Sequence, residues 1–72
     1  MKTQTITLLP GAYNIHIARA TEHETTIYYN IPHPKDKVHI WIVPEKWEIE
    51  TINENIVTLV NHDEIIKRTC LK

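Results

Sequence analysis

The chain has 72 residues, of which 42% are apolar and 24% are charged, and this composition predicts one small folded domain rather than a disordered segment. Its 8 basic and 9 acidic residues exclude the large basic surplus that dedicated nucleic-acid-binding proteins carry. Cys70 is the only cysteine, which excludes an intramolecular disulfide.

Short segments of alternating apolar and polar residues follow one another along the chain, and this period of two predicts β-strands. The predicted strands cover residues 3–9, 13–20, 25–30, 38–43, 47–52 and 56–60. Pro10 and Gly11 predict the first turn, and asparagines predict the turns at 53–55 and 61–63, because Asn tolerates positive φ. Residues 64–71 are predicted as a seventh strand, with a short helix as the alternative.

Two strands decide where the aromatic side chains lie. We expect strands 25–30 and 38–43 to pair as a hairpin across the proline-rich segment 31–37. The side chains expected on the core face of this hairpin are Ile27, Tyr29, Val38, Ile40 and Ile42. The side chains expected on its outer face are Tyr28, His39 and Trp41.

Six or seven short strands joined by short turns are typical of a small antiparallel β-barrel or roll, and we expect an SH3-like or OB-like arrangement. The predicted class is therefore mainly β, in a single domain that covers residues 1–72. Closure into a barrel would remove free sheet edges, which a chain rich in β-forming residues needs to protect. Because the core of so short a chain is thin, we also expect the protein to be a homo-oligomer.

The outer face of the expected hairpin is the candidate binding site. Exposed aromatic side chains gathered on one face usually bind another molecule. Lys35 and Lys37 lie in the adjoining segment and would edge this patch. The predicted partner-binding residues are Tyr28, His39, Trp41, Lys35 and Lys37. The alternative is that both faces of strand 38–43 are buried and that Trp41 belongs to the core.

Residue combinations that support catalysis or metal binding are missing from the sequence. The five histidines lack the short ligand spacing of zinc sites, there is no serine, and a single glycine excludes a Gly-rich phosphate loop. Glu48 and Glu50, on one side of a predicted strand, are charges typical of a protected edge. We therefore expect no enzyme activity, no catalytic residue, no metal site and no cofactor.

These observations favour a small protein-binding module, such as an inhibitor, adaptor or assembly factor, that acts through the aromatic patch or a free β-edge. The alternative is a nucleic-acid-binding regulator on a small β-barrel, which the Tyr and Trp content favours and the charge balance disfavours. Without a long apolar run or a leader segment, a cytoplasmic location and no membrane contact are expected. The small size is also typical of accessory proteins encoded by phages or plasmids.

Overall fold

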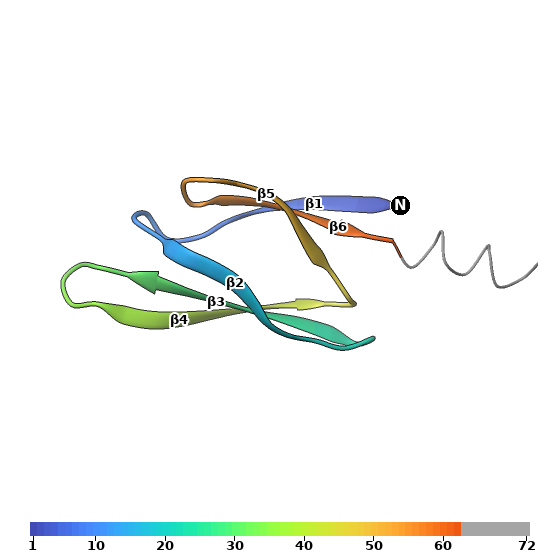
Figure 1. Ribbon diagram of the computed structural model, residues 1–72, viewed down its shortest axis with the longest axis horizontal. Coiled ribbons are helices and arrows are strands. Elements are labelled where there is room, and N and C mark those ends of the chain that lie inside the picture. The colour runs from blue at the N-terminus through green and yellow to red at the C-terminus, as the bar shows by residue number, and fades with distance from the viewer. Residues whose placement is uncertain (63–72) are drawn as a thin grey trace, which may run out of the picture.

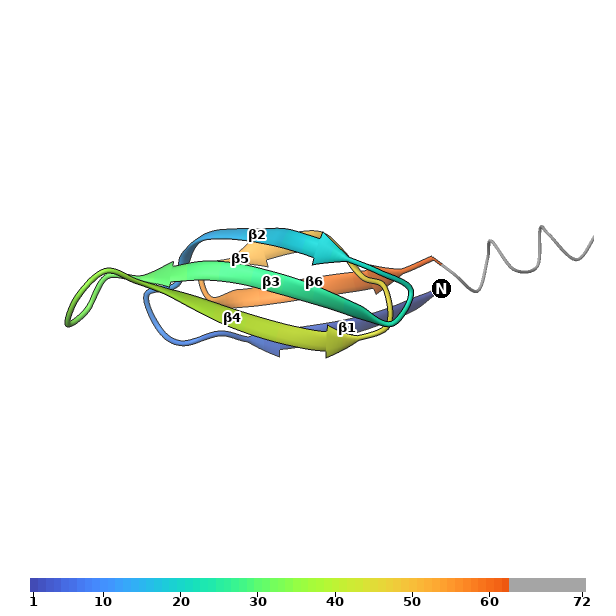
Figure 2. The ribbon, with the colours of Figure 1, turned by 90° about the horizontal axis from the view of Figure 1, so that it is seen from below.

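A computed structural model describes residues 1–62 of the chain and contains six β-strands and no helix within this range. The strands are β1 (Lys2–Thr7), β2 (Tyr13–Ala20), β3 (Glu24–Ile31), β4 (Lys37–Pro44), β5 (Glu48–Asn53) and β6 (Ile56–Asn61). They form two antiparallel three-stranded sheets with the strand orders β1-β6-β5 and β2-β3-β4. The two sheets face each other (Figure 1), and Figure 2 shows β2, β3 and β4 in front of the other sheet.

The mainly β, antiparallel class predicted from the sequence is confirmed for the described residues. All six strands predicted in this range are present, and their bounds differ from the predicted ones by one or two residues at most. An SH3-like or OB-like barrel is not confirmed, because residues 1–62 form two separate sheets that keep their free edges. The seventh strand or short helix predicted over 64–71 lies outside the described residues.

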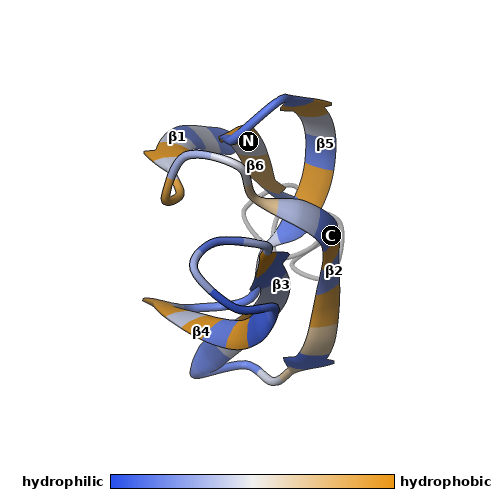
Figure 3. Ribbon diagram, turned by 90° about the vertical axis from the view of Figure 1, so that its left-hand side faces the viewer, coloured by the Kyte–Doolittle hydropathy of each residue, from blue (hydrophilic) through white to orange (hydrophobic). Residues whose placement is uncertain are grey.

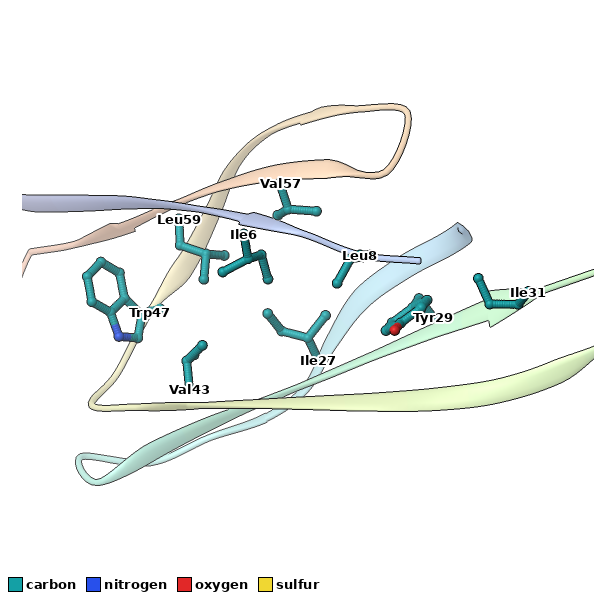
Figure 4. Close-up of a cluster of buried hydrophobic side chains, with 9 residues drawn as sticks. All are labelled: Ile6, Leu8, Ile27, Tyr29, Ile31, Val43, Trp47, Val57 and Leu59. Carbon is teal, nitrogen blue, oxygen red and sulfur yellow. The ribbon is translucent and has the colours of Figure 1, made fainter. Parts of the chain in front are cut away.

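The core lies between the two sheets, and both sheets contribute to it (Figure 4). Its nine buried apolar side chains are Ile6, Leu8, Ile27, Tyr29, Ile31, Val43, Trp47, Val57 and Leu59. Removing these side chains from water is the main favourable term, at about 25 cal/mol per Å² of apolar surface. Because β3 turns every second side chain toward this layer, its inward positions are all buried.

The first predicted turn is confirmed in detail. The N–H of Ala12 donates to the carbonyl oxygen of Leu9 at 3.2 Å, and Gly11 has a φ of 87°, as a type II turn with Pro10 before it requires. In the β5–β6 hairpin, however, Glu54 takes the left-handed conformation, with a φ of 56°, in place of the asparagines on either side of it.

The predicted orientation of β4 is wrong. In the pairing of β3 with β4, Ile27 lies opposite Trp41, and Tyr28 lies opposite Ile40. Directly opposed residues share a face of the sheet, so Trp41 faces the core with Ile27, which is fully buried. β4 carries apolar side chains on both faces, so its own sequence does not decide which face is buried. Its register with β3 decides this, because a slip of one residue would move every β4 side chain to the opposite face of the sheet.

Candidate protein-binding surface

The sheet β2-β3-β4 turns one face away from the core, and the strand pairing fixes which residues lie on it. Its three rows, read from β2 through β3 to β4, are Tyr13–Asn30–Val38, His16–Tyr28–Ile40 and Arg19–Thr26–Ile42. The β2 end of each row is polar or aromatic, whereas the β4 end is aliphatic in all three. We call this surface the outer face.

The aliphatic ends of the rows form a continuous stripe along one strand. Val38, Ile40 and Ile42 have exposed fractions of 60%, 57% and 58%. The inner side of β4 is already occupied by His39, Trp41 and the buried Val43, so the three aliphatic side chains cannot turn inward. The alternation of apolar and polar positions along β4 is visible in Figure 3. We call Val38, Ile40 and Ile42 the β4 stripe.

Tyr28 lies next to the β4 stripe, opposite Ile40 on the central strand. Its ring also contacts the His16 ring from the other side, with the centroids 6.1 Å apart and the planes tilted by 53°. The Nδ1 atom of His16 lies 2.9 Å from the carbonyl oxygen of Asn14, which fixes this imidazole at the bulged part of β2. Tyr28 is therefore a half-buried aromatic platform beside exposed aliphatic side chains.

The structure separates the residues that the sequence analysis placed in one patch. Tyr28 lies on the outer face, but His39 and Trp41 lie on the inner side of β4. The His39 ring stacks on the buried Tyr29 ring, with centroids 5.5 Å apart, and Trp41 packs against the core. The shared outer face expected for Tyr28, His39 and Trp41 is therefore wrong as a statement of geometry.

The β4 stripe is the feature that sequence reasoning missed. The signal that could have located it is the length of the connection between β3 and β4, because the hairpin loop fixes the register of the two strands. Asn30 lies opposite Val38, so even-numbered residues meet even-numbered ones, and the outward Tyr28 brings Ile40 outward with it.

Lys35 and Lys37 are exposed at the tip of the β3–β4 hairpin, which projects from the end of the molecule (Figure 2). Asp36 lies between them, and its Oδ1 accepts a hydrogen bond of 2.7 Å from the hydroxyl of Tyr13. That hydrogen bond raises the pKa of Tyr13 above its ordinary value of 10.0. The loop is thus a mixed-charge tip at one end of the β4 stripe rather than a uniformly basic rim.

Within residues 1–62, β4 is the end strand of its sheet, and the backbone of the β4 stripe points to this free edge. The N–H of Glu45 donates to the carbonyl oxygen of His23 at 2.9 Å, so these two odd-numbered residues bond to each other across the β3–β4 side. The N–H of Thr21 donates to the carbonyl oxygen of Glu24 at 2.8 Å, so the even-numbered Glu24 bonds toward β2 instead. Hydrogen bonding alternates along antiparallel strands, and the β3–β4 register is uninterrupted, so odd-numbered residues of β4 bond to β3. The N–H and C=O groups of the three stripe residues therefore point away from the sheet.

The other edges in the described part of the chain are less suited to pairing. β2 has two register shifts and a positive φ at Asn14, and it lies beside β5. β5 has a register shift and carries Glu48 and Glu50. β1 is regular but polar, with exposed Thr3, Thr5 and Thr7. Bulges and charges are the usual protection of sheet edges, and β4 has neither along its stripe.

Among residues 1–62, no three His, Cys, Asp or Glu side chains converge in a way that could hold a metal ion. The described residues also contain no helix of sufficient length and apolar character to cross a membrane. No family model, no curated protein and no solved structure matches this chain.

Proposed function

We propose that the chain is a small protein-binding module, of the inhibitor, adaptor or assembly-factor kind, and that its binding surface is the β4 stripe together with Tyr28. The observation that carries this proposal is the exposure of Val38, Ile40 and Ile42 on one face of one strand. Contiguous apolar surface of this kind is rare on monomers without a binding role. An aromatic ring beside aliphatic side chains is also the usual composition of an interface centre.

The free backbone along β4 gives this surface a second means of recognition. A partner strand that pairs with the edge would gain main-chain hydrogen bonds, while the stripe would select its side chains. The predicted roles of His39 and Trp41 in partner binding are not part of the proposal, because both side chains lie on the inner side of β4.

Differential capture tests the proposal. Wild-type protein, Ile40→Lys and the control Ile52→Lys are immobilised and exposed to lysate from cells that carry the gene. Ile52 is 47% exposed on β5 and lies outside the β4 stripe, so it matches the change without altering the surface. We expect a partner that wild type and Ile52→Lys bind equally and that Ile40→Lys binds at least about tenfold more weakly.

Folding must be equal for this comparison, and far-UV circular dichroism of the three proteins provides the control. Capture of the same proteins by wild type and by a folded Ile40→Lys variant would contradict the proposal.

Nucleic-acid binding is the second candidate, because His16, Tyr28 and Arg19 share the outer face. Aromatic and basic side chains together form single-strand platforms in other proteins. Passage over a single-stranded oligonucleotide column separates the two functions. The protein-binding proposal predicts no retention, whereas retention that weakens steeply as salt is raised would favour the second candidate.

A further inference from the structure

We infer that the occupant of the β4 edge is a second copy of this chain, paired antiparallel about a two-fold axis that passes beside Ile40. The inference rests on the proposed function, because it names the partner of the same surface. Its starting point is that an apolar strand with free N–H and C=O groups is the feature of a sheet edge that most readily pairs with another strand.

The β4 stripe is self-complementary under this symmetry. In an antiparallel pair with Ile40 opposite the partner's Ile40, Val38 lies opposite the partner's Ile42 and Ile42 lies opposite the partner's Val38. All three pairs are aliphatic, and all three use backbone groups that point to the free edge. In such positions each pair exchanges both of its N–H···O hydrogen bonds.

Neighbouring registers are worse for identifiable reasons. A shift in one direction places Ile42 opposite the partner's Asp36, which sets an aliphatic side chain against a carboxylate. A shift in the other direction places Val38 opposite the partner's Pro44, which has no N–H to donate. The carbonyl oxygen of Pro44 also already accepts a hydrogen bond of 2.6 Å from Nε1 of Trp47. Pairing centred on Ile40 keeps Pro44 outside the aliphatic pairs.

Charge at the two ends of β4 fits the same register. The antiparallel arrangement brings the hairpin tip of one copy, which carries Lys35, near the C-terminal end of β4 in the other, where Glu45 begins the turn that follows the strand. Lys35 is exposed, and the side chain of Glu45 is 48% exposed although it already pairs with Lys2 at 3.0 Å. A tip with two lysines and one aspartate therefore comes near a glutamate at both ends of the pair, because the two-fold axis repeats each approach.

The resulting sheet runs β2-β3-β4 and then through the partner's strands in reverse order. It removes both β4 edges and brings the two aliphatic stripes side by side on one continuous face. The outward surfaces of the stripes and of Tyr28 stay in solvent, so the dimer still presents the outer face to a further protein.

Charged substitutions at Val38 and Ile42 test the inference. The variants Val38→Lys/Ile42→Lys and Val38→Glu/Ile42→Glu each place like charges opposite one another in the proposed register. We expect sedimentation at micromolar concentration to show a dimer for wild type and a dimerisation constant weakened at least about tenfold for each double variant. An equimolar mixture of the two variants is expected to recover a heterodimer.

A third double variant tests the antiparallel direction of the pairing and its two-fold symmetry with a single kind of chain. Val38→Lys/Ile42→Glu places Lys opposite Glu in a dimer of identical copies, so we expect it to dimerise. Ile52→Lys is the control and is expected to dimerise as wild type does. Failure of the folded basic and acidic variants to associate on mixing, or a wild-type monomer at micromolar concentration, would overturn the inference.

Amide hydrogen exchange gives a measurement that does not depend on a substitution. The amides of Val38, Ile40 and Ile42 should be protected in concentrated wild-type protein and should exchange faster on dilution. The amides of His39 and Trp41, which bond to β3, should be protected at both concentrations. Fast exchange at the three stripe amides at every concentration would count against pairing along β4.

The variant Tyr28→Lys distinguishes failure of this inference from failure of the proposed function. Tyr28 lies on the outer face of the central strand and not on the β4 edge, so its change should leave the dimer intact and weaken the capture of a further protein. A monomeric wild type that still loses its partner on Ile40→Lys would overturn only the inference. A dimer that captures no further protein would confirm self-pairing and leave a second copy as the only protein bound.

Discussion

Trp41 packs its indole against the core between the sheets, while Ile40 and Ile42 on either side of it stand in solvent. Residue type alone suggests the reverse, with the isoleucines buried and Trp41 at the surface, because Ile is commonly fully buried and a half-exposed Trp is common. The pairing of Trp41 with the fully buried Ile27 settles the matter, since both lie on the inner face of their hairpin. Trp41 therefore contributes to stability, and its neighbours contribute to the surface.

Replacement of Trp41 by Ala should lower the free energy of unfolding by roughly 2–4 kcal/mol, somewhat less than for a fully buried Trp because this side chain lies at the margin of the core. Urea denaturation measures the change. The matched control is Ile42→Ala, for which we expect a loss below about 1 kcal/mol because the side chain is exposed. Both are made in an Ile40→Lys background, so that self-association does not contribute. A Trp41→Ala protein as stable as its background would contradict the inward placement.

The sequence was sufficient to predict which residues of β3 are buried, because polar and apolar residues alternate clearly there. Ile27 and Tyr29 were predicted inward and are 0% and 4% exposed. It was not sufficient for β4, where one face carries Val38, Ile40 and Ile42 and the other also carries large apolar side chains, Trp41 and Val43, beside His39. That choice depends on which residue of β3 lies opposite, and a non-local register is not encoded in the local pattern.

At the scale of elements, the connection between β4 and β5 is held by a buried side chain from β3. The hydroxyl of Thr25 donates to the carbonyl oxygen of Glu45 at 2.9 Å and accepts a hydrogen bond of 2.8 Å from the N–H of Trp47. Thr25 is fully buried, so water cannot replace either bond. The corner is closed further by Glu45, whose carboxylate accepts hydrogen bonds from Lys2 and Asn61 of the other sheet. These contacts link the two sheets where the chain passes between them.

The change Thr25→Val keeps the shape of the side chain and removes both hydrogen bonds. It leaves the N–H of Trp47 without its partner, so we expect the free energy of unfolding to fall by about 1–3 kcal/mol. Thr26→Val, on the outer face of the same strand, is the control and should change stability by no more than about 0.5 kcal/mol. Chemical denaturation in the same Ile40→Lys background provides both values. Equal stability of the two variants would show that Thr25 does not hold the corner.

The elements themselves were predictable because their signals are local. The turn at Pro10 and Gly11 follows from the φ preferences of those two residues, and both are used as expected. The arrangement of the sheets was not predictable in the same way. The first strand pairs with the last strand of the described range, and this long-range choice produces two open sheets where a closed barrel was expected.

At the scale of the whole molecule, two three-stranded sheets share one layer of buried side chains and leave four edges in the described part of the chain. A chain of 72 residues buries a smaller fraction of its surface than a larger domain and is correspondingly less stable. Three edges are protected by bulges, charge or polar side chains, and the fourth carries the β4 stripe. Pairing along that edge would therefore contribute to the stability of the fold as well as to recognition.

Coupling between pairing and folding predicts that the melting temperature depends on protein concentration. If the folded state is a dimer and the unfolded state is a single chain, mass action stabilises the folded state as concentration rises. For a chain of this size, a tenfold increase should raise the melting temperature by roughly 3–6 °C. Far-UV circular dichroism melts of wild type and Ile52→Lys over a hundredfold range should both show this rise, while Ile40→Lys should melt at a lower temperature that does not change with concentration. A wild-type melting temperature that is constant over the same range would mean that the folded protein is a monomer, in which case the β4 edge pairs with a strand of a different protein or with none.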